Sequence, residues 1–354
     1  MPSHLIYLAA DDPAARQARH QAGVRLALST QAAAMEPDLP PDGGGVESGY
    51  AQTLLWLLQQ ALPEAVCHRD PVQITVLASP LLGNVDQRAL LAWLREFGLT
   101  PLVLAPGQRL PLSQWYELVH SRATLVIGAS LQPVADWLHA HTGIPDYRFN
   151  GLHDLAQCDR LQQLLTRLSG RLPSASQRLQ RRQLCDTLLH SSTLSGVRLA
   201  LALSADRLLA YLPLLRQLGL RLECAVLADT PSAHSGLLCP QTRHQLGCDH
   251  LLIGDSRHLA ATLPLGADLL LSDQALCARQ RGMPPPTPSG TLPQLELTMS
   301  RQGREVASLG YHGIAVQLQQ WQQQFSQLAL PSTSRGWIWP SAPRPIPRTL
   351  KPLR

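Results

Sequence analysis

The amino-acid sequence predicts an α/β protein built from two doubly wound, Rossmann-like parallel-sheet domains. The main observation is an alternation of short apolar strands with amphipathic helices, which occurs in residues 71–150 and again in residues 196–330. This alternation favours parallel sheets that are covered by helices on both faces. The composition agrees, because a chain of 354 residues with 45% hydrophobic and 16% charged residues can bury a core in two domains.

Residues 71–150 are expected to form the first α/β domain. The pattern of β-branched runs and turn residues predicts strands over 72–78, 99–104, 123–128 and 144–149, and helices over 84–97 and 133–141. Asn84 is the expected N-cap of the first of these helices, and Gly98 and Gly143 are expected to end the two helices.

Residues 151–195 are predicted to be two connecting helices, over 152–168 and 174–191, separated by Gly170 and Pro173. The alternation then restarts in a second α/β domain, residues 196–330. Its expected elements are strands over 197–203, 220–227, 249–253 and 267–271, helices over 205–218, 256–262 and 313–328, and a proline-rich loop over 283–292.

The two ends of the chain do not follow this alternation. Residues 1–70 predict helices over 16–28 and 49–62 joined by a loop over 36–45, a segment too short for a core of its own and expected to pack on the next domain. Residues 331–354 hold six prolines and five basic residues with no acidic residue, so we expect an extended or disordered basic tail.

The distribution of charge argues against a nucleic-acid-binding surface. The net charge of +5 equals the charge of the tail, and the rest of the chain is neutral. Lys351, in the tail, is the only lysine, which excludes a P-loop or Schiff-base lysine in the folded part. The sequence has no basic segment followed by an apolar one at its start and no apolar run long enough for a membrane helix. We therefore expect a cytoplasmic protein without membrane or nucleic-acid partners.

No catalytic or binding motif stands out, since the sequence lacks dinucleotide, P-loop, zincin and hydrolase-elbow patterns. The seven cysteines include no CxxC pair and are expected to be small buried hydrophobic residues. The weak candidates are the glycines Gly43–Gly45, the pairs His139 with His141 and His250 with His258, the group Cys224, Cys239, Cys248 and His250, and the carboxylates Asp206 and Asp255.

Of these candidates, Asp206 and Asp255 follow strands, where ligands bind in α/β sheets. A position in the first turn of a helix, where the helix dipole favours an acidic side chain, explains them equally well and is the interpretation that we favour. His139 and His141 are expected on different faces of one helix and cannot share a metal ion. The sequence therefore assigns no catalytic, cofactor-binding or metal-ligating residue.

An ordered set of segments resembles the nitrogenase component 1 superfamily, and within it the subunits that assemble the iron–molybdenum cofactor. Residues 178–189, RLQRRQLCDTLL, are similar to the family's RRQRSQLVDAML helix and precede the strand over 197–203, as in the family. Residues 74–79 resemble its VNVLAGS strand, residues 97–99 its FGL, residues 266–271 its strand with A-D-L-L, and residues 310–313 its G-Y-x-G. The resemblance covers about residues 70–328 and implies two sheets of nitrogenase component 1 type.

The N-terminal segment resembles a shortened remnant of the family's first domain. Residues 31–35, QAAAM, are similar to the family's Q-T-T-A-M, and Gly43–Gly45 with Glu47 to its G-G-G-x-N-x-E. In an ungapped comparison the family's H-G-S-Q-G-C falls on residues 4–9, so that Ala9 replaces the cluster-ligating cysteine. Because iron–sulfur clusters need converging thiolates, the resemblance implies a chain without a metal cluster of its own.

The resemblance thus implies a scaffold subunit in nitrogenase iron–molybdenum cofactor biosynthesis. Such a subunit pairs with a NifE-like chain and with other maturation factors, and any cluster or cofactor precursor lies on the partner. One alternative is a redox subunit of another component 1-type enzyme, such as dark protochlorophyllide reductase. Another is an unrelated two-domain α/β protein that binds a small molecule. The sequence leaves open whether the chain is an enzyme.

Overall fold

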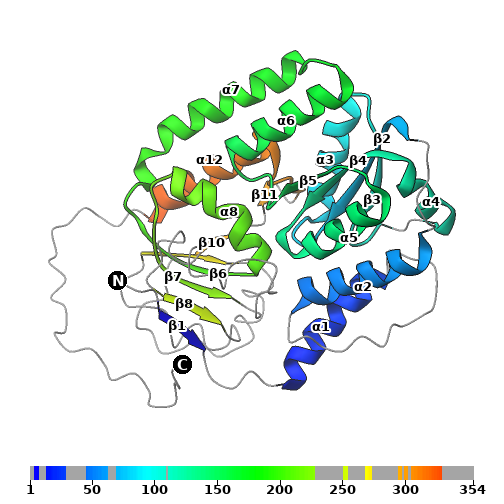
Figure 1. Cartoon of the computed structure of the whole chain (residues 1–354). Coiled ribbons are helices and arrows are strands. Elements are labelled where there is room, and N and C mark those ends of the chain that lie inside the picture. Colours follow the sequence, from blue (N-terminus) through cyan, green and yellow to red (C-terminus); the bar gives the residue numbers. More distant parts are fainter. Residues whose placement is uncertain are drawn as a thin grey trace, which may run out of the picture.

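The computed structural model of the chain describes residues 4–7, 13–28, 45–62, 69–108, 111–227, 250–253, 268–272, 294–296, 299–301 and 304–328. The strands form two parallel sheets and one antiparallel hairpin, and helices pack around them (Figure 1). The predicted α/β class with Rossmann-like parallel sheets is confirmed.

The first sheet has the strand order β3-β2-β4-β5, with all neighbours parallel. Its strands are β2 (Asp70–Ala78), β3 (Thr100–Leu104), β4 (Ser121–Ile127) and β5 (Asp146–Phe149). The chain starts at the central strand β2, moves to one side for β3 and returns to the other side for β4, as in a doubly wound sheet. β2 is buried from Gln73 onward because it has a strand on each side and helices pack on the sheet.

The second sheet has the order β1-β8-β7-β6-β9-β10 and is also parallel throughout. Its strands are β1 (His4–Tyr7), β6 (Arg198–Leu203), β7 (Arg221–Leu227), β8 (His250–Ile253), β9 (Leu269–Ser272) and β10 (Gln294–Glu296). β1 comes from the N-terminal segment and pairs with β8. The expectation that this segment packs only on the neighbouring domain is therefore wrong for β1, which extends the more distant sheet.

Three further strands were not predicted from the sequence. β10 borders the second sheet, and β11 (Met299–Arg301) pairs with β12 (Arg304–Val306) in a short hairpin. Each has only three residues and no alternation of apolar and polar side chains long enough to be recognised.

The helices agree with the predicted spans to within a few residues, apart from the short α4. They are α1 (Pro13–Leu28), α2 (Val46–Ala61), α3 (Asn84–Glu96), α4 (Leu112–Glu117), α5 (Gln132–Thr142), α6 (Leu155–Ser169), α7 (Ala175–Leu189), α8 (Ala205–Gln217) and α12 (Gly310–Leu328), with the 3₁₀ turns η1 (Leu118–His120), η2 (Ala129–Leu131) and η3 (His190–Leu194). Gly143 and Gly170 end α5 and α6 in the left-handed conformation, and Ser174 starts α7 with a capping box.

The N-cap expected at Asn84 is wrong. Gly83 occupies that position without a side-chain hydrogen bond, and Asn84 is the first residue of α3. The predicted helix over 256–262, the loop over 283–292 and the tail over 331–354 lie outside the described residues. None of the described helices is long and apolar enough to cross a membrane.

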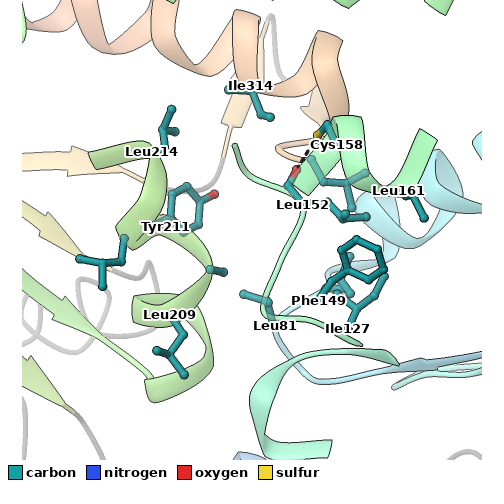
Figure 2. Close-up of a cluster of buried hydrophobic side chains, with 14 of the residues drawn as sticks. Leu81, Ile127, Phe149, Leu152, Cys158, Leu161, Leu209, Tyr211, Leu214 and Ile314 are labelled. Carbon is teal, nitrogen blue, oxygen red and sulfur yellow. Dashed lines mark hydrogen bonds between the residues drawn. The ribbon is translucent and has the colours of Figure 1, made fainter. Parts of the chain in front are cut away.

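One continuous hydrophobic core joins the two sheets. Figure 2 shows part of it, with Tyr211 of α8 on one side, Phe149 and Leu152 on the other, and Ile314 of α12 above them. α6, α7 and α12 run together across the top of both sheets in Figure 1. The two α/β units are therefore packed against each other through shared side chains as well as being joined by the connecting helices.

A second hydrophobic core lies between the first sheet and α2, with side chains of α2 such as Leu54 and Leu58 packed among those of β2, β4 and α5. α1 lies against α2 at a close crossing. A Cβ atom on Gly49 would stand 2.3 Å from the carbonyl oxygen of His20, and one on Gly23 would stand 2.1 Å from that of Val46. Both glycines are therefore required by the close approach of the two backbones.

We predict that Gly49→Ala destabilises the chain even though alanine favours helix. The helix-propensity gain is about 1 kcal/mol, whereas a methyl group 2.3 Å from backbone oxygen must push α1 and α2 apart. Overpacking of this kind costs about 1–3 kcal/mol, so we expect a net loss in the free energy of unfolding measured with denaturant. Gln59→Ala, at an exposed position of the same helix, is the matched control and should change stability little. A stabilised Gly49→Ala protein would contradict the close crossing.

Candidate functional site

Ligands of doubly wound sheets bind at the carboxyl ends of the strands, where the strand order changes direction. In the first sheet this point lies between β2 and β4, and in the second sheet between β6 and β9. The chain leaves three of these strands through Ser79, through Gly128–Ser130 and through Ser204–Asp206. The loops of the two sheets meet, and this junction is the candidate functional site.

Asp206, at the start of α8, is the residue that joins the two loops. Its carboxylate accepts hydrogen bonds from the backbone N–H of Ser130, at 2.9 Å, and from the Ser130 hydroxyl, at 2.6 Å. Burial raises the pKa of the fully buried Asp206, and hydrogen bonds from Ser130, Ser79 and Ala129 act against that rise. A carboxylate of the second unit is thus held by donors of the first unit.

Two neighbours complete the junction. Gly128 has a φ of 116°, and a Cβ atom there would lie 2.4 Å from the Ser79 hydroxyl oxygen and 2.9 Å from the Asp206 carboxylate. Glycine is therefore needed both for the backbone conformation and for the space. On the other side, the backbone N–H of Asp206 donates to the Glu47 carboxylate of α2 at 3.1 Å. Three segments that are distant in the sequence are thereby linked through one aspartate.

The hydrogen bonds around Asp206 are better suited to joining the two units than to catalysis. Ser79, Ser130 and Asp206 are all buried, so the polar groups at the junction satisfy one another. The sequence favoured a helix-dipole role for Asp206. Asp206 does lie in the first turn of α8, and its carboxylate also accepts hydrogen bonds from the loop after β4, which the sequence does not predict.

A second polar cluster lies between α3, α8 and α12. Ser308 donates its backbone N–H to the Asp86 carboxylate at 2.7 Å, and its hydroxyl lies 3.2 Å from Asp86 and 3.3 Å from Nε2 of His153. The His153 ring also packs on Tyr211 with centroids 4.3 Å apart. Burial and, to a smaller extent, the positive charge of Arg207 together lower the pKa of His153 to about 3.

Serine, histidine and aspartate also form the catalytic triads of hydrolases, but the hydrogen bonds among Ser308, His153 and Asp86 follow a different order. In a triad the aspartate binds the histidine and orients it toward the serine. Asp86 instead binds Ser308, and Nδ1 of His153 has no hydrogen-bond partner among the described residues. A buried histidine that stays neutral above about pH 3 is also a weak general base. The cluster therefore joins α3 to α12 and does not form a nucleophile.

The described cysteines are Cys158 on α6, Cys185 on α7 and Cys224 on β7, and none of them belongs to a group of three potential metal ligands among the described residues. Burial raises the pKa of the Cys158 thiol well above its ordinary value, and the charges of Asp154 and Asp159 raise it further. A protonated thiol is a poor metal ligand. Cys67, Cys239, Cys248 and Cys277 lie outside the described residues.

The other sequence candidates do not converge. Nδ1 of His139 lies 2.8 Å from the carbonyl oxygen of Ile144, whereas His141 stacks on Trp137. Among the residues that the structure covers, no three His, Cys, Asp or Glu side chains come together as a possible metal site. Of the remaining candidates, Gly45 immediately precedes α2 and His250 is the first residue of β8. The others lie outside the described residues: Gly43, Gly44, Asp255 and His258.

Sequence reasoning missed most residues of both clusters. Ser79 and Ser130 each follow a buried strand, and that position could have drawn attention to them. His153, Ser308 and Glu47 carry no such signal, because their partners are distant along the chain.

We predict that His153 makes the chain less stable in acid. Unfolded histidine takes up a proton below about pH 6.5, whereas buried His153 remains neutral down to about pH 3, so the unfolded state binds more protons between these values. The free energy of unfolding should therefore fall by up to about 1.4 kcal/mol per pH unit as pH decreases through this range.

His153→Gln should lose this dependence, whereas the same substitution at the exposed His312 should keep it. Denaturant titrations at several pH values measure how the free energy of unfolding depends on pH in wild type and the two variants. The raised pKa values of Asp86 and Asp206 give a pH dependence of opposite sign, which all three proteins share. Equal slopes for wild type and His153→Gln would show that the histidine is accessible to protons.

Comparison with known proteins agrees with the fold. A family model described as nitrogenase component 1 type oxidoreductase matches residues 35–325. A solved structure titled nitrogenase Cp1 at pH 6.5 superposes with a TM-score of 0.63 and 15% identity, covering 84% of this chain and 69% of that one. A second, nitrogenase Cp1 at pH 5, gives a TM-score of 0.53 at 13% identity, over 81% of this chain and 64% of the other.

Curated relatives with similar sequences are named nitrogenase iron-molybdenum cofactor biosynthesis protein NifN. The protein from Rippkaea orientalis is 29% identical over 271 residues, covering 66% of this chain and 56% of the relative. Those from Rhizobium meliloti and Bradyrhizobium diazoefficiens are each 26% identical, over 66% and 53% of this chain and 55% and 44% of their own lengths. The chain thus spans about half the length of the curated relatives that it matches.

These matches confirm the resemblance inferred from the ordered motifs and exclude the alternative of an unrelated α/β protein. The family match extends over most of the chain and includes the described sheets, apart from β1, and the junction between them. The chain belongs to the nitrogenase component 1 type oxidoreductase family.

Proposed function

We propose that this chain is a NifN-like scaffold subunit in nitrogenase iron–molybdenum cofactor biosynthesis, that it acts in the cytoplasm, and that it pairs with a NifE-like subunit. The observation that carries the proposal is the similarity to three proteins named NifN over half to two thirds of the chain. The buried junction at Asp206 supports a structural role, because its polar groups bind one another and keep the two units in a fixed arrangement.

We further propose that the chain contributes no metal cluster and that the cofactor precursor is cargo held mainly by the partner. The placement of the described cysteines supports this proposal, because cluster ligation requires several converging thiolates and no such group occurs among the described residues. A redox subunit, as in dark protochlorophyllide reduction, would instead need a cluster of its own.

Iron and acid-labile sulfide analysis of anaerobically purified chain tests this proposal. We expect iron and sulfide well below one equivalent per chain, because the described cysteines belong to no group of three side chains that could hold a metal. Reconstitution with iron and sulfide under reducing conditions is the positive control for cluster loss during purification. A stoichiometric cluster after either treatment would favour the redox-subunit alternative.

The outward face of α7 is the surface that we propose for the NifE-like partner. Leu172, which precedes α7, and Leu179 and Leu189 on it are 79%, 57% and 78% exposed, and they are three of the five large hydrophobic side chains exposed among the described residues. α7 is the outermost helix at the top of Figure 1. Exposed apolar side chains grouped in this way are typical of an interface.

The charges beside these leucines define the chemistry expected of the partner. Arg178 and Arg182 lie on the same exposed face of α7, and Asp186 is its one exposed acidic residue. Arg181, in contrast, is engaged in a two-pronged ion pair with Asp159 of α6. The complementary surface should therefore be an apolar one bordered by acidic side chains.

We predict that Leu179→Glu combined with Leu189→Glu weakens binding to a NifE-like subunit at least about tenfold without unfolding the chain, because both side chains are exposed before binding. Anaerobic co-purification, followed by titration of the two purified proteins, measures the effect. Tyr116→Glu, an exposed large side chain on α4 away from this face, is the control and should bind normally. Normal binding by the double variant would contradict the proposed α7 interface. If the wild-type chain did not bind a NifE-like subunit, the proposed partner would be wrong.

A further inference from the structure

The loop after β4 offers a set of hydrogen-bond donors that is suited to an anion. The backbone N–H and the hydroxyl of Ser130 donate to the carboxyl group of Asp206. The backbone N–H of Ala129 and the hydroxyl of Ser79 act on the same carboxyl group and lower its pKa. Neighbouring backbone N–H groups combined with hydroxyls are a common means of binding carboxylates and phosphates in proteins. We call these four donors the cradle.

We propose that Asp206 is a built-in ligand of this cradle and latches the two α/β units together. The cradle belongs to the first unit, since β2 and β4 lead into it, whereas Asp206 begins the helix that follows β6 of the second unit. The carboxylate fills the position that an external anion could take in a doubly wound sheet, at the point where the strand order changes.

The surrounding contacts explain why the cradle accepts this carboxylate and leaves no space for a second anion. Gly128 brings the loop so close that a single added Cβ would lie 2.9 Å from Asp206 and 2.4 Å from Ser79. The Glu47 side chain, which accepts a hydrogen bond from the backbone N–H of Asp206, places acceptor oxygens beside the site, and these disfavour another anion. The carboxylate is fully buried, so separation of the two units would leave it and its donors without partners until water enters.

A second close contact keeps α8 in register with the cradle. A Cβ on Gly151, in the segment after β5, would lie 2.5 Å from the Cβ of Ala210 on α8. The first unit thus touches α8 at Asp206 and again one turn later at Ala210, which fixes the direction of the helix as well as its start. The latch follows from these contacts alone and does not depend on the proposed function.

Chemical rescue of Asp206→Ala tests the latch, because this substitution removes a group the size of formate. In sodium chloride we expect the variant to melt several degrees below wild type. Sodium formate at the same concentration should restore much of that loss by occupying the cradle. Asp206→Asn is the matched control, since its amide fills the cradle and leaves no space for formate. It should be destabilised but not rescued.

Small-angle scattering distinguishes a latch from a merely local stabilising contact. Asp206→Ala should show a larger radius of gyration than wild type in chloride and should return toward the wild-type value in formate. Formate that acts equally on wild type, Asp206→Ala and Asp206→Asn would overturn the proposal. An unchanged radius of gyration accompanied by a lower Tm would also overturn it, because the contact would then be local.

A double-mutant cycle keeps the test decisive if Asp206→Ala does not fold. Ser130→Ala and Asp206→Asn each disturb the same hydrogen bond, that between the serine hydroxyl and the carboxylate. We therefore expect the Tm loss of the double variant to be clearly smaller than the sum of the two single losses. Additive losses would mean that the two residues do not act together, and the latch would be rejected.

Discussion

One buried carboxyl group gives the contact between the two α/β units its direction, within the apolar core that they share. A carboxyl group that leaves water must regain its hydrogen bonds inside the protein, and Asp206 obtains its side-chain donors from the opposite unit. The cost of leaving this buried polar group without partners therefore disfavours arrangements in which the loop after β4 and the start of α8 do not meet. This constraint is directional, in contrast to the apolar core around it, and selects one arrangement of the units among the many that would bury similar area.

The C-terminal helix α12 adds a second constraint away from the junction. The segment that leads into it is tied to α3 by the bond between Ser308 and Asp86, and Tyr311 in its first turn packs on Trp93 of α3 and donates to Asp159 of α6. α12 also lies along α7. The connecting helices are thus fixed from both sides, and the position of α7 depends on how the two sheets are joined.

The parts of the fold that the sequence predicts are those determined by local interactions. The strands of the first unit follow from buried β-branched runs, and the ends of α5 and α6 follow from Gly143 and Gly170. β1 could not be assigned to its sheet in this way, because its partner β8 lies more than two hundred residues later. Likewise, the first-turn position of Asp206 is a local property that the sequence reveals, whereas its bond to Ser130, 76 residues away, is not.

The proposed scaffold role requires rigidity between the faces that the chain presents, and the contact at Asp206 contributes to that rigidity. Loops at the carboxyl ends of parallel strands are the usual place for a ligand, and a ligand there would make the arrangement of the units depend on its concentration. Because the Asp206 side chain is part of the chain, it occupies this position whatever the concentration of free ligands, and the arrangement of the two units does not depend on them. Because α7 is one of the two helices that connect the units, the orientation of its exposed leucines depends on how the units pack, and the Asp206 contact contributes to that packing. The proposed partner surface on α7 and the buried Asp206 side chain are therefore coupled through the packing of the two units, although they are not in contact.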